Sequence, residues 1–354
     1  MTIVVELWAA PIPLPSPVVT PAGTFDTYHH LVVIASDGEE SQGWGIAGSV
    51  TPEALDLTVD RARVLLAAAE HESAGLLAVE GLEVAGSAIP CDRFSRWAAG
   101  ALATAGWDLA ARRAGVRCAD LWAIGAAPTE LDCYASGFFL STPEDELIQE
   151  AQRYRAAGFA KVKMRTGGEI ESDLARLALV RSVFPDDGAI AVDAVNGWDP
   201  AAARSFIDGA GSLLWVEDPV PLDAIAELRD VDALVAAGES LTSVPELEAL
   251  FATGAVPAVL LDVQQLGGPE RFLEAARRLR ATGALMGAHI FTHVSAHLLA
   301  AIDDPLPVEI FDWSDPLCVE PLQPLPSGRV EVAGPGFGVE IDRSTLVEQG
   351  TRVL

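Results

Sequence analysis

Residues Ala189–Glu239 indicate the fold most clearly, because they repeat one pattern three times: an apolar run that ends in an acidic residue. The runs are AIAVD (189–193), LLWVE (213–217) and ALVAAGE (233–239), and the segments between them have helical spacing. Asp193, Glu217 and Glu239 are 24 and 22 residues apart, which is the length of one strand–helix unit. The pattern therefore predicts parallel strands connected by helices.

The same alternation continues on both sides of this stretch. Helical segments, such as Glu144–Ala157 and Pro269–Ala281, separate further apolar runs. Eight units over roughly 190 residues have the count and size of a (β/α)8-type TIM barrel, an α/β fold. A doubly wound open sheet is the rival, but it needs a GxGxxG turn after an early strand, and none is found there. The predicted strands are Asp132–Ser136, Lys161–Arg165, Ala189–Asp193, Leu213–Glu217, Ala233–Ala237, Ala258–Asp262, Ala284–Ala288 and Val308–Ile310.

The first third of the chain has a different rhythm. Short strands are predicted at Val4–Trp8 and His30–Ala35, and Ala/Leu-rich helices at Pro52–Glu70 and Asp92–Arg113. Proline interrupts regular structure, so the proline-rich stretch between the two strands is predicted to be a loop that turns the chain into a hairpin. These features predict an α+β module over residues 1–125, a barrel over 126–325, and a segment over 326–354 that returns to the first module. The prolines are Pro11, Pro13, Pro15, Pro17 and Pro21.

Charge and composition exclude several classes of protein. Among 354 residues, 51 are Asp or Glu and 23 are Lys or Arg, for a formal net charge of −28, so nucleic acid and anionic membranes are not expected partners. No apolar run approaches the ~20 residues that span a bilayer, and the N-terminus lacks the pattern of a signal peptide. The four cysteines form no CxxC pair, which favours the reducing cytoplasm over a disulfide scaffold. They are Cys91, Cys118, Cys133 and Cys318.

Ionisable residues stand at the ends of seven consecutive predicted strands. Because the carboxyl ends of barrel strands meet at one mouth, where active sites lie, these side chains are expected to converge. Asp262 follows Glu239 after another 23 residues, so the spacing of one strand–helix unit is maintained over four strands. The complete set is Lys163, Arg165, Asp193, Glu217, Glu239, Asp262, His289 and Glu309.

Asp193, Glu217 and Glu239 are candidate metal ligands. Three carboxylates without Cys or His offer the hard oxygen atoms that Mg²⁺ or Mn²⁺ prefers. Without a cation, the three carboxylates would repel one another, and this repulsion would raise their pKa values. The alternative is that Asp193 and Glu217 each cap the following helix.

Asp262 and His289 stand one barrel step apart. A carboxylate beside an imidazole fixes its tautomer and raises its basicity, so His289 is the candidate general base. His293 and His297 follow at helical spacing and, without the glutamate of a metalloprotease motif, are expected to serve helix packing.

The only two lysines of the chain, Lys161 and Lys163, lie two residues apart, and Arg165 continues the alternation. All three side chains therefore point to the same side of a strand, into the barrel. Lys163 and Arg165 are nearest the mouth, where they would hold a substrate carboxylate and stabilise the charge that forms during proton abstraction. Lys161 is expected lower in the barrel, paired with an internal acid.

Six motifs in this order resemble the enolase superfamily, and more narrowly its mandelate racemase subgroup. The likeness extends over nearly the whole chain, including WDLAARRAG (Trp107–Gly115), which is similar to the end of the family's capping domain. It implies metal ligands at Asp193, Glu217 and Glu239, an Asp262–His289 dyad, and Glu309 bonded to the intermediate. The motifs are GFAKVKMRTG (158–167), VDAVNGWD (192–199), WVEDP (215–219), GES (238–240), LDVQQLGG (261–268) and GAHIFTHVSAHLLAA (287–301).

The resemblance also implies that the first module is a capping domain whose loops close over the barrel mouth and choose the substrate, with Tyr28, His29 and the proline-rich segment as candidates. It implies self-association as a homo-oligomer. Two departures are notable: the family's Lys-x-Lys pair is Lys163-Met164-Arg165 here, and Val195 stands where the family usually has Asn. The first departure puts a second, lysine-based proton acceptor in doubt, and the second a polar contact near the metal.

The chemistry that the resemblance implies is Mg²⁺-dependent removal of the proton next to a carboxylate, through an enediolate. Racemisation needs acid–base groups on both faces of the carbon, and arginine is a poor base. Dehydration can use His289 alone, so we expect an acid-sugar dehydratase that forms a 2-keto-3-deoxy acid in carbohydrate acid catabolism. The alternatives are a racemase or epimerase of a 2-hydroxy or related acid, and a non-catalytic relative.

Overall fold

The computed structural model describes residues 3–20, 23–38, 41–70 and 92–354; Pro21 and Cys91 lie outside these ranges. Its elements in chain order are β1 (Val4–Thr20), β2 (Gly23–Ser36), β3 (Gln42–Ser49), α1 (Pro52–Glu70), α3 (Arg93–Ala114), α4 (Cys118–Trp122), β4 (Glu130–Gly137), α5 (Glu144–Ala156), β5 (Val162–Arg165), α6 (Ile170–Arg181), β6 (Ile190–Asp193), α7 (Pro200–Ala210), β7 (Val216–Glu217), η1 (Ile225–Leu228), β8 (Val235–Ala237), α8 (Val244–Ala252), β9 (Ala258–Leu261), α9 (Val263–Leu266), α10 (Pro269–Arg280), β10 (Leu285–Ala288), α11 (Thr292–Ala300), β11 (Val308–Ile310), η2 (Asp312–Leu317), β12 (Arg329–Glu331), α12 (Arg343–Gln349) and β13 (Thr351–Arg352).

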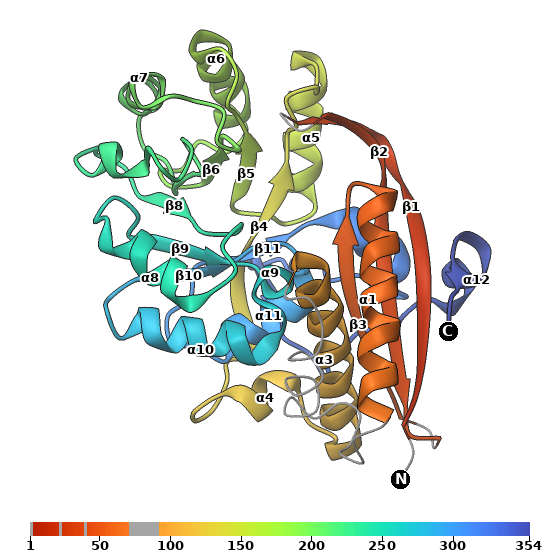
Figure 1. Cartoon of the computed structure of the whole chain (residues 1–354). Helices are drawn as coiled ribbons and strands as arrows, with labels where there is room; N and C mark the ends of the chain where they lie inside the picture. The colour runs from red at the N-terminus through yellow and green to blue at the C-terminus, as the bar shows by residue number, and fades with distance from the viewer. Residues whose placement is uncertain (1–2, 21–22, 39–40, 71–91) are drawn as a thin grey trace.

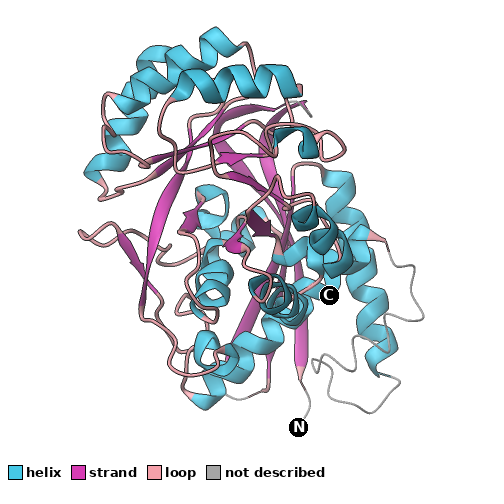
Figure 2. Ribbon diagram, turned by 90° about the vertical axis from the view of Figure 1, so that its left-hand side faces the viewer, coloured by secondary structure: helices cyan, strands magenta, loops and turns pink. Residues whose placement is uncertain are grey.

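Eight parallel strands form the barrel, in the order β10-β9-β8-β7-β6-β5-β4-β11. Near the seam between β10 and β11, the amide of Leu306 donates to the carbonyl of Met286 at 2.8 Å, so the ring is nearly closed. Helices surround these strands (Figure 2). All eight strands predicted from the sequence are confirmed, but a short 3-10 helix, η2, follows the last strand in place of an eighth α-helix.

The barrel has two apolar layers. Inside it, Tyr134, Trp215 and Leu260 form a small buried cluster with alanines of β6, β8 and β9. Outside it, a larger core fills the space between strands and helices, which is why the strand sequences are apolar on both faces. The interior cluster fills the barrel below its mouth, so that polar side chains are confined to the carboxyl ends of the strands.

The N-terminal part is an antiparallel sheet in the order β13-β1-β2-β3, with α1 and α3 packed against it (Figure 1). The predicted helices are confirmed, and Asp92 caps α3 by accepting a hydrogen bond from the amide of Ser95 at 2.8 Å. At the other end of the chain, β13 pairs with β1, so the C-terminal segment returns to this sheet, while β12 pairs with β4 of the barrel. The three domain boundaries stay a prediction.

The prediction of a loop for the proline-rich stretch is wrong, because Pro11, Pro13, Pro15 and Pro17 lie within β1. β13 pairs with β1 only at Trp8 and Ala9, so beyond that point β1 is an edge strand. The amide of Leu7 donates to the carbonyl of Leu354, which shows that odd-numbered residues of this part of β1 direct their N–H groups outward. Pro11 and Pro13 continue this phase, so their missing N–H groups fall on the open edge, where no ladder bond is lost.

The opposite edge of the sheet is attached to the barrel by one glutamine side chain. Gln264 of α9 accepts a hydrogen bond from the amide of Gly48 at 2.6 Å and donates one to its carbonyl at 3.1 Å. Further along β3, Asp108 of α3 accepts a hydrogen bond from the amide of Trp44 at 3.0 Å. Buried backbone groups at this edge are thus satisfied by side chains. The sheet is consequently held over the same short helix that follows Asp262.

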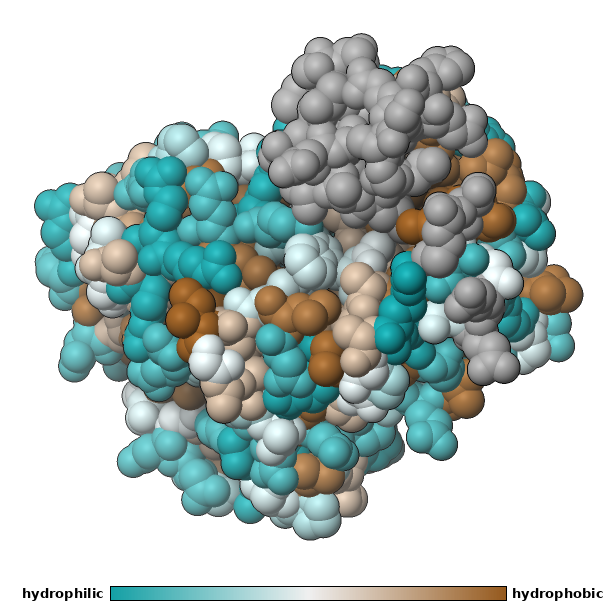
Figure 3. Space-filling model, turned by 90° about the horizontal axis from the view of Figure 1, so that it is seen from below, coloured by the Kyte–Doolittle hydropathy of each residue, from teal (hydrophilic) through white to brown (hydrophobic). Residues whose placement is uncertain are grey.

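The surface agrees with the acidic composition. The face drawn in Figure 3 is mostly hydrophilic, with apolar residues scattered over it. Among the described residues, no helix combines the length and the apolar character that crossing a membrane requires.

Candidate active site

The mouth of the barrel is lined by ionisable side chains from successive strands, as the sequence predicts. Lys163, Glu217 and Glu309 are completely buried, and Asp193 and Asp262 are nearly so. Glu239 and His289 keep a quarter and a fifth of their side chains exposed, so they border the open space above. Buried charges are stable only when paired, and the pairing described next shows how the site is organised.

Lys163 is the centre of the buried charges. Its Nζ lies 2.8 Å from Glu217 Oε1, 2.9 Å from Glu309 Oε1 and 3.8 Å from Asp193 Oδ2. The other oxygen of Glu217 accepts a hydrogen bond from Trp215 Nε1 at 2.9 Å, and that of Glu309 accepts one from the amide of Ile290 at 2.8 Å. One ammonium group therefore connects the second, fourth and eighth barrel strands.

Arg165 pairs with Asp193 on the neighbouring strand β6, and its other nitrogen donates to Ser136 Oγ at 3.3 Å. The second oxygen of Asp193 accepts a hydrogen bond from the amide of Val195 at 2.8 Å. The cap of α7 is Asp199, not Asp193, so the alternative role of Asp193 as a cap of this helix is wrong.

His289 lies between two carboxylates. Its Nδ1 is 2.8 Å from Asp262 Oδ2, and its Nε2 is 3.1 Å from Glu239 Oε2. Asp262 also caps α9, because its other oxygen accepts hydrogen bonds from the amides of Gln264 and Gln265 at 2.7 and 2.9 Å. The cap fixes the carboxylate, and the carboxylate fixes the imidazole with Nε2 directed toward the metal-ligand candidates.

The pKa values of these groups reflect their pairing. Burial would lower the pKa of His289, but the charge of Glu239 and the hydrogen bond of Asp262 outweigh it and raise the pKa to about 9. Burial would raise the pKa of Glu309, but Lys163 holds it at about 2. Despite complete burial, the charges of Glu217 and Glu309 raise the pKa of Lys163, so this side chain is a fixed cation.

The donor chemistry of the mouth fits a divalent cation. Six carboxyl groups face only three basic groups, and burial together with neighbouring acids raises the pKa values of Asp218 and Glu239. One oxygen of Asp218 is buried without a hydrogen-bond partner. Within the described residues, no three side chains surround one point as they would an ion, because the acids are turned toward basic groups. The carboxyl groups are those of Asp193, Glu217, Asp218, Glu239, Asp262 and Glu309; the basic groups are Lys163, Arg165 and His289.

Backbone strain is concentrated at the same end of the barrel. Non-glycine residues with positive φ lie within two residues after four strands: Phe138 after β4, Val195 after β6, Asp218 after β7, and Ile290 after β10. For a β-branched residue such as Val195 (φ 49°) this conformation is a genuine outlier. Such strain costs about 1–3 kcal/mol per residue and is typical of functional sites.

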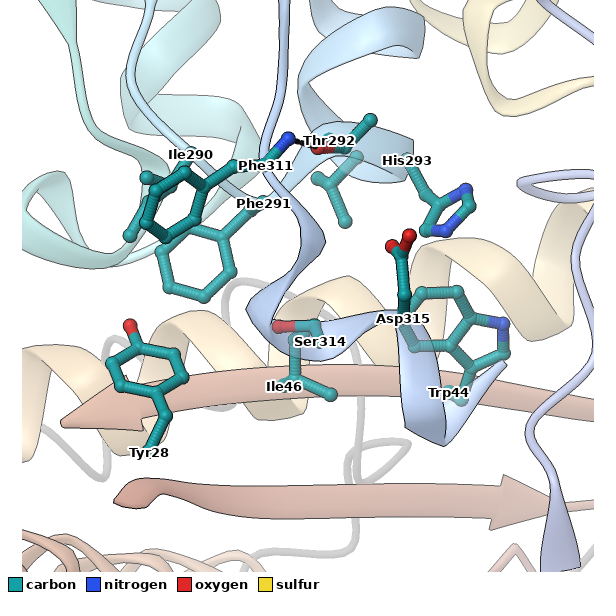
Figure 4. Close-up of a pocket in the computed structure, with 11 residues that line it drawn as sticks. Tyr28, Trp44, Ile46, Ile290, Phe291, Thr292, His293, Phe311, Ser314 and Asp315 are labelled. Carbon is teal, nitrogen blue, oxygen red and sulfur yellow. Dashed lines mark hydrogen bonds between the residues drawn. The ribbon is translucent and has the colours of Figure 1, made fainter. Parts of the chain in front are cut away.

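A cavity of about 350 Å³ opens above these groups, between the N-terminal sheet and the barrel. Tyr28 of β2 lines it, and its contact with a substrate stays a prediction. Figure 4 shows a small neighbouring pocket that shares Tyr28, Ile290 and Phe311 with this cavity, with Tyr28 on the side of the N-terminal sheet and Phe311 on the side of the barrel. The structure does not bring His29 to this cavity. Because neighbouring residues of a strand point to opposite faces, His29 lines a small separate pocket with Thr58 and Trp97.

The lining also contains residues that the sequence analysis did not identify, notably Phe139, Val50 and Trp313. Phe139 follows the carboxyl end of β4, the first barrel strand, so the strand pattern does contain a signal for its position at the mouth. Nothing in the local sequence distinguishes Val50 or Trp313, which reach the cavity from the segment after β3 and from η2.

Two secondary expectations are also tested by the geometry. Lys161 does pair with an acid, Asp132, at 2.8 Å, but the partner is exposed rather than internal. His293 and His297 are buried in α11, where His297 accepts a hydrogen bond from the amide of Ala119 at 3.2 Å. Their predicted packing role is confirmed.

Comparison with known proteins places this geometry in a family. Residues 146–345 match the family described as "Enolase C-terminal domain-like". The chain is 32% identical over 262 residues to L-talarate/galactarate dehydratase of Salmonella typhimurium, covering 70% of this chain and 62% of that enzyme, and 28% identical to hydrophobic dipeptide epimerase of Citrifermentans bemidjiense, covering 93% and 94%.

Solved structures agree with this placement. L-talarate dehydratase of Polaromonas sp. JS666, crystallised with Mg and L-glucarate, superposes with a TM-score of 0.84 at 26% identity, covering 99% of this chain and 98% of that one. A mandelate racemase/muconate lactonizing enzyme of the same organism gives 0.83 at 26%, with the same coverage. The chain belongs to the enolase superfamily, in its mandelate racemase and muconate lactonizing enzyme group.

Proposed function

We propose that the chain is a Mg²⁺-dependent enzyme that removes the α-proton of a hydroxylated carboxylate and then eliminates the β-hydroxyl group, as a dehydratase of the acid-sugar type. The observation that supports this proposal is that the mouth of the barrel offers one candidate base, on one side of the place where the substrate would lie. His289 is the imidazole at the site, whereas Lys163 and Arg165, across the ring on β5, are held as cations by Glu217, Glu309 and Asp193.

Asp193, Glu217 and Glu239 would hold the cation, because they combine hard oxygen donors with adjacent strands. A bound Mg²⁺ supplies positive charge for the substrate carboxylate as it becomes an enediolate. Lys163 and Arg165 add fixed cations beside the same carboxylate. Glu309, bonded to the amide of Ile290, is in place to accept a hydrogen bond from the intermediate.

Proton transfer is assigned to His289. The charge of Glu239 is the main cause that raises the pKa of His289, so the imidazole would be the neutral base once Glu239 binds the cation instead. Its Nε2 then takes the α-proton, and the resulting imidazolium returns a proton to the β-hydroxyl as the C–O bond breaks. The products are water and an enol, which becomes the 2-keto-3-deoxy acid. Asp262 keeps the proton of Nδ1 in place, so that Nε2 remains the atom that exchanges protons.

The test is proton NMR in D₂O with Mg²⁺ and a panel of mono- and diacid sugars. We expect keto acid formation by the wild-type chain and about a 10²- to 10⁴-fold loss of α-proton exchange in His289→Asn. His29→Asn is the matched control, since His29 lies in another pocket, and should keep its rate. Absence of exchange with every carboxylate would support the non-catalytic alternative.

An epimerase is the second candidate, because the dipeptide epimerase aligns along nearly the whole chain. The same NMR experiment separates the two: α-proton exchange with inversion and no keto acid would favour the epimerase.

Two broader expectations remain proposals. Cys118, Cys133 and Cys318 are buried and unpaired, which suits a reducing compartment such as the cytoplasm. A small carboxylate is the expected partner. The net negative charge makes nucleic acid and anionic membranes unfavourable partners. Homo-oligomerisation is proposed from membership of the family.

A further inference from the structure

The cavity above the barrel mouth has two chemically different ends. At its base lie Arg165, Asp193, Glu239 and His289. The remaining lining comes mostly from aliphatic and aromatic side chains contributed by both the N-terminal sheet and the barrel. A ligand cavity that combines convergent polar groups with an apolar wall recognises a molecule with the same division.

Trp313 organises the apolar end. Its ring lies 5.0 Å from that of Tyr28, 4.5 Å from that of Phe311, and stacks on Phe139 with centroids 5.7 Å apart. Tyr28 also packs with Val50 in the same apolar cluster. Trp313, Phe139 and Val50 are only partly buried, so their apolar surfaces face the cavity and are available to cover a substrate.

The apolar end holds no basic side chain among the described residues that line the cavity. Arg165 and His289 are both at the base, where Arg165 pairs with Asp193 and His289 with Glu239 and Asp262. The stretches that the structure does not describe contain no Lys or Arg. A second carboxylate at the far end of a substrate would therefore lie against apolar side chains without a cationic partner, which is unfavourable.

We propose that the substrate is a monocarboxylate whose far end, remote from the reacting carbon, is an aromatic or alkyl group, and that the wall around Trp313 selects against diacids. This inference rests on the proposed function, since it takes the base of the cavity as the place of the reacting carboxylate. It separates this chain from a relative whose name specifies the diacids talarate and galactarate.

The test uses three substrates that share the 2,3-dihydroxy acid unit. Galactarate and 6-deoxygalactonate differ at one carbon, which is a carboxylate in the first and a methyl group in the second, and the stereoisomers of 3-phenylglycerate carry a phenyl group. We expect kcat/KM to fall in the order 3-phenylglycerate, 6-deoxygalactonate, galactarate, with at least about a 100-fold difference between the extremes, as for an unpaired buried charge.

Variants locate the preference in the wall. Val50→Arg places a cation at the apolar end and should lower kcat/KM for 3-phenylglycerate by at least about 10-fold while raising that for galactarate. Val347→Arg, on the exposed helix α12, is the matched control and should change neither. Phe25→Ser, which removes a cavity-lining ring, should raise KM for 3-phenylglycerate with little change in kcat, and thermal melts establish that each variant is folded.

The outcomes separate the two proposals. If galactarate is used as well as or better than the two monoacids, the inference about the far end is wrong, while proton abstraction at the base stands. If none of the three exchanges its α-proton in D₂O and none yields a keto acid, the proposed function fails. A preference for monoacids that Val50→Arg does not alter would also contradict the role of the wall.

Discussion

At the scale of single residues, Arg165 decides which reaction the mouth can perform. It lies two residues after Lys163 on β5, across the barrel from His289, and pairs with Asp193. Because a guanidinium keeps its proton at any physiological pH, this side of the substrate lacks a base. A lysine at the same place can lose its proton when its surroundings favour the neutral amine.

Arg165→Lys is therefore expected to add epimerisation to the wild-type reaction. Chiral chromatography of the recovered substrate should show inversion at the α-carbon that the wild type lacks, while keto acid formation falls, because lysine cannot contact both Asp193 and Ser136. Inversion by the wild type at a comparable rate would contradict a one-base mouth.

The residues of the candidate site illustrate what a sequence reveals. Asp193, Glu217, Glu239 and Asp262 could be located because strand ends in a barrel repeat with the length of one strand–helix unit. Trp313 could not, since its position in the cavity depends on how the sheet lies over the barrel, and such packing leaves no periodic signal. The prediction that His29 reaches the cavity beside Tyr28 is wrong, because the sequence alone does not show which residues of β2 face the barrel.

At the scale of elements, Gln264 connects the edge of β3 to α9. Replacing it with leucine leaves the amide and carbonyl of Gly48 buried without partners. Gln264→Leu should therefore lower the free energy of unfolding by about 2–4 kcal/mol, the combined cost of two unsatisfied groups. Urea denaturation measures the change, and Gln149→Leu on the exposed face of α5 is the control. Equal stability of both variants would show that the contact is dispensable.

Buried histidines should make the chain sensitive to acid. Burial lowers the pKa values of His30 and His293 to about 4 and that of His297 to about 3, against 6.5 when unfolded. The unfolded chain then binds more protons between pH 6.5 and 4, so stability is full above this window and falls as pH decreases through it.

The contribution of one histidine can be isolated with His293→Leu, because its pKa is lowered by burial alone. The slope of unfolding free energy against pH should be shallower in this variant by up to about 1.4 kcal/mol per pH unit between 6.5 and 4. Urea titrations at several pH values supply both slopes. Parallel curves would indicate that the imidazole is already protonated in the folded chain.

The elements themselves were predicted unequally well. All eight barrel strands and the helices α1 and α3 follow from apolar periodicity, which burial imposes directly. The length of β1 is not predictable in this way, because proline generally interrupts strands and only the register against β2 and β13 shows that the missing N–H groups face outward. Between β7 and β8 the chain forms only the short 3-10 helix η1, which the repeated strand–helix pattern does not reveal.

At the scale of the whole molecule, charge dominates. The formal net charge is −28, so negative charges repel one another in the compact state. The crowded carboxylates of the mouth add a local excess of negative charge. Salt of any kind should therefore stabilise the fold by screening, and a bound divalent ion should stabilise it further.

We expect MgCl₂ to raise the melting temperature more than NaCl of equal ionic strength does. At a hundredfold excess over Kd, binding contributes about 2.7 kcal/mol. Differential scanning calorimetry of the wild type and of Glu239→Gln should show a magnesium-specific increase only in the wild type. An increase of the same size in both would place the ion elsewhere.

The alternating prolines of β1 also bear on how copies of this protein can meet. At one edge of the sheet, β1 lacks N–H groups at Pro11 and Pro13, so it is a poor partner for a further strand from a neighbouring molecule. At the other edge, the side chains of Asp108 and Gln264 already bond to backbone groups of β3. Continuous sheets running from molecule to molecule are thereby disfavoured at both margins. Pairing between copies of this protein, strand against strand, is therefore unfavourable at these two edges of the described sheet.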